Sequence, residues 1–375
     1  GDNMGRTIYR ASLIAIGIAA IMPQKQALAA VKIEFGDNQF VSVGMGIRGA
    51  FRSTENADNN GDRSNDFSLD SARLYIAGAV NDKISGIFTT EKSGGNDTMQ
   101  VIDAAGIFKL TPDIEIWAGR FLSPGSRANL AGPYYSLGGD YWQNIAARYG
   151  WNGGTIGRDD GVAVVAKAFD QRLVYSFGAF DADKIFHFSG VNDVADNPEQ
   201  SDALMYASRL QYSFWDKEPG YYGTGNYLGN KDIFTVGIAY RQKSDGAASP
   251  AAVGDYSQLT IDLLIEKRIS GGAVSLEAAY FDYDTGDVFL SEQGRAYSVG
   301  LGYIFAQQVG WGQFQPYARY QNFAADTDIT TARTDVGVNY IIDSYNAQVG
   351  IGYANLDVSQ QSSADSITAS LQLQF

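Results

Sequence analysis

The chain contains no cysteine and only one histidine, His187, among its 375 residues. The absence of cysteine excludes disulfides, thiolate metal sites and covalent haem attachment. Acid–base and nucleophilic catalysis most often rely on a histidine, and His187 lies in a long acidic connection where a loop residue is expected and not a base. We therefore predict no cofactor and no metal, and we predict that the chain is not an enzyme.

Long apolar runs are also missing after the first 30 residues. No later stretch approaches the roughly 18 consecutive apolar residues of a membrane-spanning helix. The first 30 residues combine two arginines, a short apolar run at 11–22 and an Ala-Leu-Ala exit at 27–29. This order is typical of a secretory signal peptide. We predict that residues 1–30 are cleaved and that 31–375 form one domain.

Proline is scarce and positive charge is in the minority. The chain has 8 prolines against 43 glycines, 23 tyrosines and 20 phenylalanines, and its net charge is −14. Many aromatics and few prolines favour long antiparallel strands with aromatic girdles. The acidic balance argues against a nucleic-acid partner.

The end of the chain alternates without interruption between apolar and polar side chains. Ile367, Ala369, Leu371, Leu373 and Phe375 share one face, and Thr, Ser and Gln fill the other. This pattern suits a strand between lipid and water, and barrel-insertion machinery is taken to read a terminal phenylalanine. We predict a Gram-negative outer-membrane β-barrel with Phe375 as its insertion signal; the alternative is an edge strand of a soluble sandwich.

The same alternation along the chain predicts an all-β, transmembrane, antiparallel up-and-down β-barrel of about sixteen strands. An even number allows both chain ends to lie in the periplasm. Tight turns such as 81–83 alternate with longer polar stretches such as 244–254. The connection 216–230 is long where a short turn is due, and a periplasmic contact is the one explanation the sequence offers. The predicted strands cover 38–52, 67–80, 84–92, 98–110, 114–122, 160–169, 172–181, 203–215, 231–243, 255–269, 273–283, 294–306, 313–324, 330–342, 345–356 and 364–375.

Period-two geometry sorts each strand into an outward and an inward face. The sorting predicts a net basic lumen, whereas most acidic residues fall in loops. The long connection 123–159, rich in glycine and aromatics, is expected to fold inward and constrict the channel, with a surface lid or a subunit contact as the alternative. Inward arginines could instead pair with carboxylates and only stiffen the wall. The predicted pore-lining and constriction residues are Arg48, Arg73, Asp103, Arg120, Arg127, Arg148, Arg209, Arg241 and Arg319.

Three short segments carry a resemblance to a known family. They are Leu69 to Tyr75 (LDSARLY), Val101 to Phe108 (VIDAAGIF) and Gly119 to Pro124 (GRFLSP). Over about residues 67–130 the chain resembles the phosphate-selective porin O and P family.

The resemblance implies a sixteen-stranded, usually trimeric, general or anion-selective porin. It also implies an inward-folded third loop and pore-lining arginines, with Arg73 and Arg120 as candidates. Gly125 stands where the family tends to carry an aromatic residue, and a dense cluster of arginine and lysine is not identifiable. Phosphate specificity is therefore not implied.

Together these features predict an outer-membrane porin for passive diffusion of small hydrophilic solutes, either anion-preferring or weakly selective. The expected partners are outer-membrane lipid and lipopolysaccharide, the barrel-assembly machinery and, from the resemblance, two further copies in a homotrimer. One alternative is a barrel that sheathes a separate periplasmic partner such as a cytochrome. Another is an outer-membrane enzyme.

Overall fold

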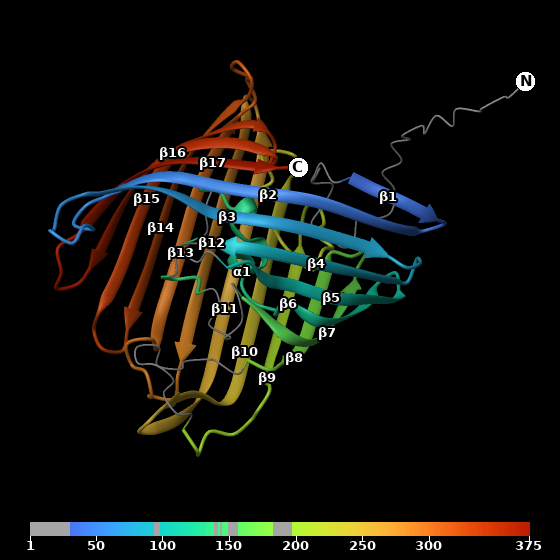
Figure 1. The fold of residues 1–375 in the computed structure, drawn as a ribbon, viewed down its shortest axis with the longest axis horizontal. Helices are drawn as coiled ribbons and strands as arrows, with labels where there is room; N and C mark the ends of the chain where they lie inside the picture. The colour runs from blue at the N-terminus through green and yellow to red at the C-terminus, as the bar shows by residue number, and fades with distance from the viewer. Residues whose placement is uncertain (1–30, 94–97, 139–141, 143–144, 149–156, 183–196) are drawn as a thin grey trace, which may run out of the picture.

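The computed structural model of the chain describes residues 31–93, 98–138, 142, 145–148, 157–182 and 197–375. Figure 1 shows the fold as a ring of long strands. The predicted signal peptide and His187 lie outside the described residues.

Strands β2 to β17 form a closed, sixteen-stranded antiparallel barrel. Each pairs with the strands before and after it in sequence, and β17 pairs with β2. The prediction of an up-and-down barrel is confirmed. The strands are β1 (Val31–Gly36), β2 (Gln39–Thr54), β3 (Ser64–Ala79), β4 (Ile84–Ser93), β5 (Gln100–Thr111), β6 (Ile114–Leu122), β7 (Arg158–Ala168), β8 (Leu173–Phe180), β9 (Met205–Ser213), β10 (Ile233–Ser249), β11 (Ala252–Ile269), β12 (Gly272–Asp284), β13 (Gly294–Phe305), β14 (Gln313–Ala325), β15 (Thr330–Asp343), β16 (Ala347–Val358) and β17 (Ala364–Gln374).

One predicted loop is a hairpin. Residues 244–254 were expected to form a long polar loop, but β10 and β11 pair as far as Ser249 and Ala252. The register shifts between Lys243 and Ala247, and Asp245 has a positive φ of 52°. A bulge with polar residues interrupts the alternation without ending the strand, which is why the sequence pattern suggested a loop.

The short strand β1 was not predicted. Val31 pairs with Val43 of β2, and Phe375 exchanges backbone hydrogen bonds with Met45 of β2. Because β3 occupies the other edge of β2, β1 and β17 lie along the same edge. Along this edge of β2, β1 therefore continues the line of β17 beyond the last residue of β17.

The barrel wall is apolar outside and polar inside. On β17, Ile367 and Leu371 are 47% and 43% exposed, whereas Gln372 and Gln374 are 4% exposed. The same alternation recurs on β13, where Tyr297 is exposed and Ser298 is buried. Apolar residues on the outer face and polar residues within are what a barrel surrounded by lipid requires.

Two short helices lie inside the ring. They are α1 (Arg127–Ala131) and the 3-10 helix η1 (Pro133–Tyr135), and every residue of α1 is buried. The hydroxyl of Ser126 caps α1 by accepting a hydrogen bond from the Asn129 backbone N–H. Within the described residues, no helix is long and apolar enough to span a membrane.

Candidate pore and its constriction

Two chain segments fold into the barrel from opposite ends. The first, which we call the constriction loop, comprises residues 123–138 and follows β6. The second, the inward turn, comprises residues 216–230 between β9 and β10. Nearly all residues of the constriction loop are buried, and about half of those of the inward turn are. The prediction that the third long connection folds inward therefore holds for residues 123–138, while much of 139–156 lies outside the described residues.

The constriction loop crosses the lumen from one wall to the other. Arg241 on β10 donates to the Pro124 carbonyl at 2.7 Å. At the other end, Gln372 on β17 donates to the Tyr134 carbonyl at 3.1 Å, and Ser71 on β3 hydrogen-bonds the Tyr134 hydroxyl at 2.9 Å. In the ring order β10 lies eight strands from β2, so these anchors stand on opposite sides.

A glycine makes one of these anchors possible. A Cβ on Gly46 of β2 would lie 2.9 Å from the Tyr134 ring. The ring packs against the wall here because Gly46 carries no side chain. The neighbouring Arg48 and Arg73 place their guanidinium groups 5.7 and 5.1 Å from the centroid of the same ring.

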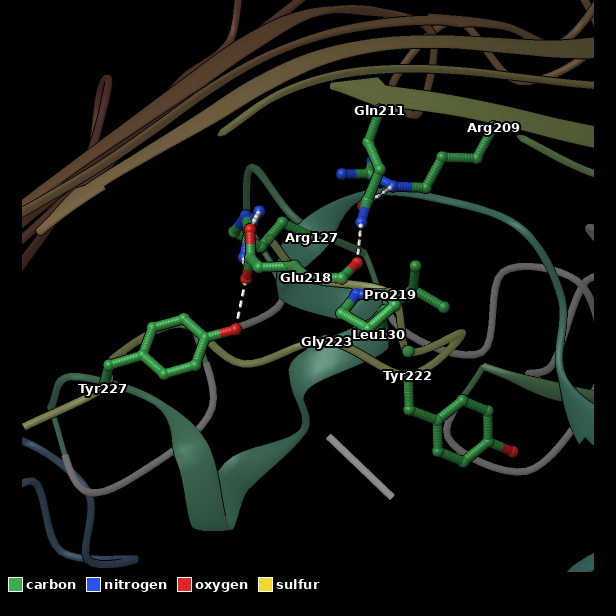
Figure 2. A pocket seen from close by; sticks show the side chains of 10 residues that line it. Arg127, Leu130, Arg209, Gln211, Glu218, Pro219, Tyr222, Gly223 and Tyr227 are labelled. Carbon is green, nitrogen blue, oxygen red and sulfur yellow. Dashed lines mark hydrogen bonds and ion pairs between the residues drawn. The ribbon is translucent and has the colours of Figure 1, made fainter. Parts of the chain in front are cut away.

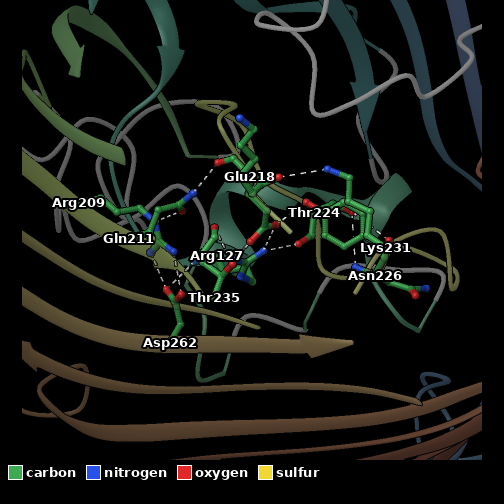
Figure 3. Close-up of polar contacts among 12 residues, drawn as sticks. Arg127, Arg209, Gln211, Glu218, Thr224, Asn226, Lys231, Thr235 and Asp262 are labelled. Atoms are coloured by element: carbon green, nitrogen blue, oxygen red, sulfur yellow. Dashed lines mark hydrogen bonds and ion pairs between the residues drawn. The ribbon is translucent and has the colours of Figure 1, made fainter. Parts of the chain in front are cut away.

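The inward turn meets the constriction loop within the barrel (Figure 3). The backbone N–H groups of Gly223 and Gly225 donate to the carbonyls of Leu130 and Tyr135, each at 3.1 Å. The Tyr221 hydroxyl donates to the Leu122 carbonyl at 2.6 Å. The sequence suggested a periplasmic contact for this connection. Its contacts are instead inside the barrel, which corrects that expectation.

A buried ion pair joins the two segments. Arg127 of α1 donates from both terminal nitrogens to Glu218, at 3.0 and 2.8 Å, and also to the Thr224 carbonyl at 2.8 Å. The two side chains are 3% and 6% exposed. The Tyr227 hydroxyl donates to the same carboxylate, and Figure 2 shows Arg127, Glu218 and Tyr227 lining one cavity with Arg209 and Gln211.

Electrostatics favour the charged form of this pair. Burial alone would raise the pKa of Glu218, but the Arg127 charge and the hydrogen bonds outweigh it and hold the pKa below its usual value. Burial raises the pKa of Tyr227, and the neighbouring Glu218 charge adds to that rise. Burial likewise raises the pKa of Tyr135 to about 12. These phenols stay neutral hydrogen-bond donors at physiological pH.

The structure places the predicted arginines inside the barrel, but it gives most of them a carboxylate partner. Arg120 and Asp160 are 40% and 48% exposed and Glu292, the partner of Arg148, is 45% exposed, whereas the other pairs are largely enclosed. The pairs are Arg73–Glu91 at 2.8 Å, Arg120–Asp160 at 2.7 Å, Arg127–Glu218 at 2.8 Å, Arg148–Glu292 at 2.7 Å, Arg209–Asp262 at 2.6 Å and Arg319–Asp335 at 3.8 Å.

The remaining predicted residues have other partners. Arg241 donates to the carbonyls of Ser123 and Pro124, and Arg48 lies over the Tyr134 ring. Asp103 accepts from Arg158 at 3.3 Å and from the Tyr222 hydroxyl at 2.8 Å. The expected net basic lumen is thus largely compensated by nearby carboxylates in the part that the structure describes.

Sequence reasoning missed Glu218 and the whole inward turn as interior elements. A usable signal was present, because Pro219 to Gly223 reads Pro-Gly-Tyr-Tyr-Gly. This mixture of glycine and aromatics matches that of the 123–159 connection, for which an inward fold was predicted. No group of three or more His, Cys, Asp or Glu among the described residues could hold a metal ion.

Several solved structures have a similar fold, and OmpT among them is described as an outer membrane protein. OprB from Pseudomonas putida matches with a TM-score of 0.64 at 10% identity, covering 89% of this chain and 94% of that one. OmpF from Salmonella typhi, in complex with daunomycin, gives 0.59 at 12% identity, covering 92% and 100%. OmpT from Vibrio cholerae gives 0.56 at 14% identity, also covering 92% and 100%. No protein-family model and no curated protein sequence matches the chain.

At these identities the likeness shows the fold alone, which is that of the outer-membrane porins. The narrower resemblance to the phosphate-selective porins is not confirmed. The closed sixteen-stranded barrel with its apolar exterior places the chain in the outer membrane of a Gram-negative bacterium.

The prediction that the chain is not an enzyme requires correction. OmpT from Vibrio cholerae, described as an outer membrane protein, is among the similar structures. A barrel of this fold leaves an enzymatic activity open, so a single histidine and the absence of cysteine were insufficient grounds for excluding one.

Proposed function

We propose that the protein is a porin through which small hydrophilic solutes diffuse passively across the outer membrane. The observation that supports this most is the sixteen-stranded closed barrel whose interior is lined with charged and polar side chains. Barrels of about this strand number enclose an aqueous channel. The fold likeness to OprB and OmpF supports the same function.

The proposed pore lining comprises the predicted arginines together with Asp103. Their pairing with carboxylates supports a weakly selective pore, because a passing ion meets both signs of charge within a few ångströms. A modest anion preference therefore remains a prediction. It depends on Arg241, whose guanidinium donates to the neutral carbonyl groups of Ser123 and Pro124 in the constriction loop.

A sheath around a separate periplasmic partner is less well supported. Such a sheath needs an open lumen, and here the constriction loop and the inward turn both cross the interior.

Assembly partners follow from the same proposal. One of the similar OmpT structures is described in a trimer form, which supports the proposed homotrimer. The outward apolar face requires outer-membrane lipid and lipopolysaccharide around it. Phe375, 45% exposed at the end of the barrel, is accessible to barrel-assembly machinery as a recognition signal.

The proposal is tested by purifying the protein from outer membranes and inserting it into planar lipid bilayers. Stepwise current increases and swelling of protein-loaded liposomes in small sugars and amino acids are expected. Heat-unfolded protein from the same preparation is the matched control. Folded protein that inserts but neither conducts nor admits any solute, in wild-type and shortened forms, would overturn the proposal.

A further inference from the structure

We propose that the inward turn, residues 216–230, is the second half of the pore constriction and sets the solute size limit together with the constriction loop. Glu218 is its positioning residue, because it holds Arg127 of the loop in place. The inference depends on the proposed porin function and extends it to a specific segment and side chain.

The inward turn extends across the lumen and does not merely touch one wall. Near β5 the Tyr222 hydroxyl donates to Asp103 at 2.8 Å. At β11 the Tyr227 backbone N–H donates to Glu266 at 2.9 Å. On the far side, Asn226 hydrogen-bonds Gln315 of β14 at 3.4 Å, and the Tyr345 hydroxyl donates to the Asn226 carbonyl. A solute crossing the barrel must therefore pass the space left by both segments.

The packing around the turn is tight and largely aromatic. Tyr221 and Tyr222 place their rings 5.0 and 5.6 Å from the Trp117 ring of β6. Tyr221 also lies 6.0 Å from Phe121, and Tyr221, Trp117 and Phe121 are all buried. Aromatic packing of this kind fixes the position of a segment, so the turn presents a fixed boundary to the channel.

Glu218 couples the turn to the loop. Its carboxylate accepts both terminal nitrogens of Arg127, while the Arg127 backbone N–H donates to Asp262 on β11 at 2.9 Å. Arg127 is thus held to the wall through its backbone and to the inward turn through its guanidinium. Neutralising Glu218 leaves a buried arginine without its partner, and such a group moves or draws in water.

The inward turn can be shortened without disturbing the strands on either side, because its two ends are already joined by a backbone hydrogen bond. Strands β9 and β10 continue their pairing to Asp216 and Asp232, whose backbones are joined at 2.9 Å. Residues 217–231 can therefore be replaced by Asn-Gly, a dipeptide that favours a two-residue hairpin turn. The matched control replaces residues 57–62 of the exposed connection between β2 and β3 by the same dipeptide.

We expect the 217–231 replacement to raise single-channel conductance at least twofold and to admit larger neutral sugars in liposome swelling. The 57–62 control should retain the wild-type size limit. Barrel formation in each variant is checked by the heat-dependent shift in gel mobility and by strand content in circular dichroism.

Glu218→Gln provides a second variant that keeps the chain length. It should raise open-channel current noise and shift the size limit upward, whereas a side chain with only a structural role would lower the yield of folded protein without changing the size limit. Asp282→Asn, the same acid-to-amide change in a largely exposed ion pair with Arg295, is the control and should keep the wild-type noise and size limit.

The outcomes separate the two proposals. If wild-type protein conducts and neither the shortened turn nor Glu218→Gln changes conductance or size limit, the inference is wrong and the porin function stands. If the wild type is silent and the shortened form conducts, both are supported. If neither conducts, the porin function fails and the inference fails with it.

Discussion

At the scale of single residues, the interior of this barrel is a set of compensated charges. Arg73 and Glu91, at 5% and 1% exposed, form an enclosed pair on the neighbouring strands β3 and β4. Arg209 of β9 and Asp262 of β11, at 3% and 1% exposed, form another across the intervening strand β10. Removing one partner from such a pair typically costs about 3–5 kcal/mol, since the other charge stays buried. The half-exposed pair of Arg120 and Asp160 is of a different kind, because exposed pairs contribute at most about 1 kcal/mol.

Arg120→Ala should therefore change selectivity more than stability. Loss of the guanidinium leaves the Asp160 carboxylate uncompensated beside the pore, so the reversal potential in a salt gradient should shift toward cation selectivity. Urea unfolding in lipid vesicles should change by less than about 1 kcal/mol. Asp160→Asn is the control and should shift the potential the opposite way. If both variants match the wild type, the pair does not face the ion path.

The Glu218 pair should make the constriction sensitive to acid. Because folding lowers the pKa of Glu218, the pair stabilises the fold above the ordinary glutamate pKa of about 4.3, and this contribution is lost as pH falls below that value. Arg127, Lys231, Tyr227 and Glu266 are the charged or titratable groups around it.

Channel noise recorded from pH 7 to pH 3 should rise at the acid end in wild-type protein. In Glu218→Gln it should already be high at pH 7 and change little. A wild-type trace that stays quiet down to pH 3, or a variant that repeats the wild-type rise, would show that another group responds to acid.

At the scale of elements, the strands were predictable and the interior segments were only partly so. Along a strand between lipid and water, apolar and polar side chains must alternate from one residue to the next. This requirement is local, so it can be recognised in the sequence, as in β17. The inward turn depends on contacts with residues about 90 positions away, as in the Arg127–Glu218 pair. No local pattern encodes such a contact, so the turn was taken for a periplasmic feature.

The candidate site was likewise predictable only in part: the direction of its side chains could be predicted, but their partners could not. The inward direction of Arg73 or Arg209 follows from alternation, whereas the identity of a partner across the sheet depends on register. Asp103 was predicted to line the pore, but its contact with Tyr222 could not be predicted because it crosses from β5 to the inward turn. The short strand β1 was missed because only six residues support it.

Strand β17 closes the ring, and its last residue takes part. The Phe375 backbone donates to the Met45 carbonyl at 2.8 Å and accepts from the Met45 N–H at 2.9 Å. Deleting Phe375 removes both hydrogen bonds and the terminal aromatic, so the yield of folded protein in outer membranes should fall several-fold. Phe375→Tyr, which keeps the ring and the backbone, is the control. Equal yields for deletion and wild type would remove Phe375 from the assembly signal.

At the scale of the whole molecule, two packed segments occupy much of the barrel interior. Segments from its two ends meet in the middle and hydrogen-bond to strands all around the ring. The wall and its contents therefore stabilise each other, and the space open to solutes is what two packed segments leave free.

That meeting of two segments also bears on how fast the protein can fold. Contacts between residues far apart in sequence require long loops to close, and folding slows as their share grows. Each segment folds in from one end of the barrel, and its packing adds contacts between residues far apart in sequence, such as the Arg127–Glu218 pair, that must form before assembly is complete. Protein with residues 217–231 replaced by Asn-Gly should consequently refold into lipid vesicles faster than wild type, as followed by gel mobility over time. Equal rates would mean that ring closure, and not the filling of the interior, limits the speed of assembly.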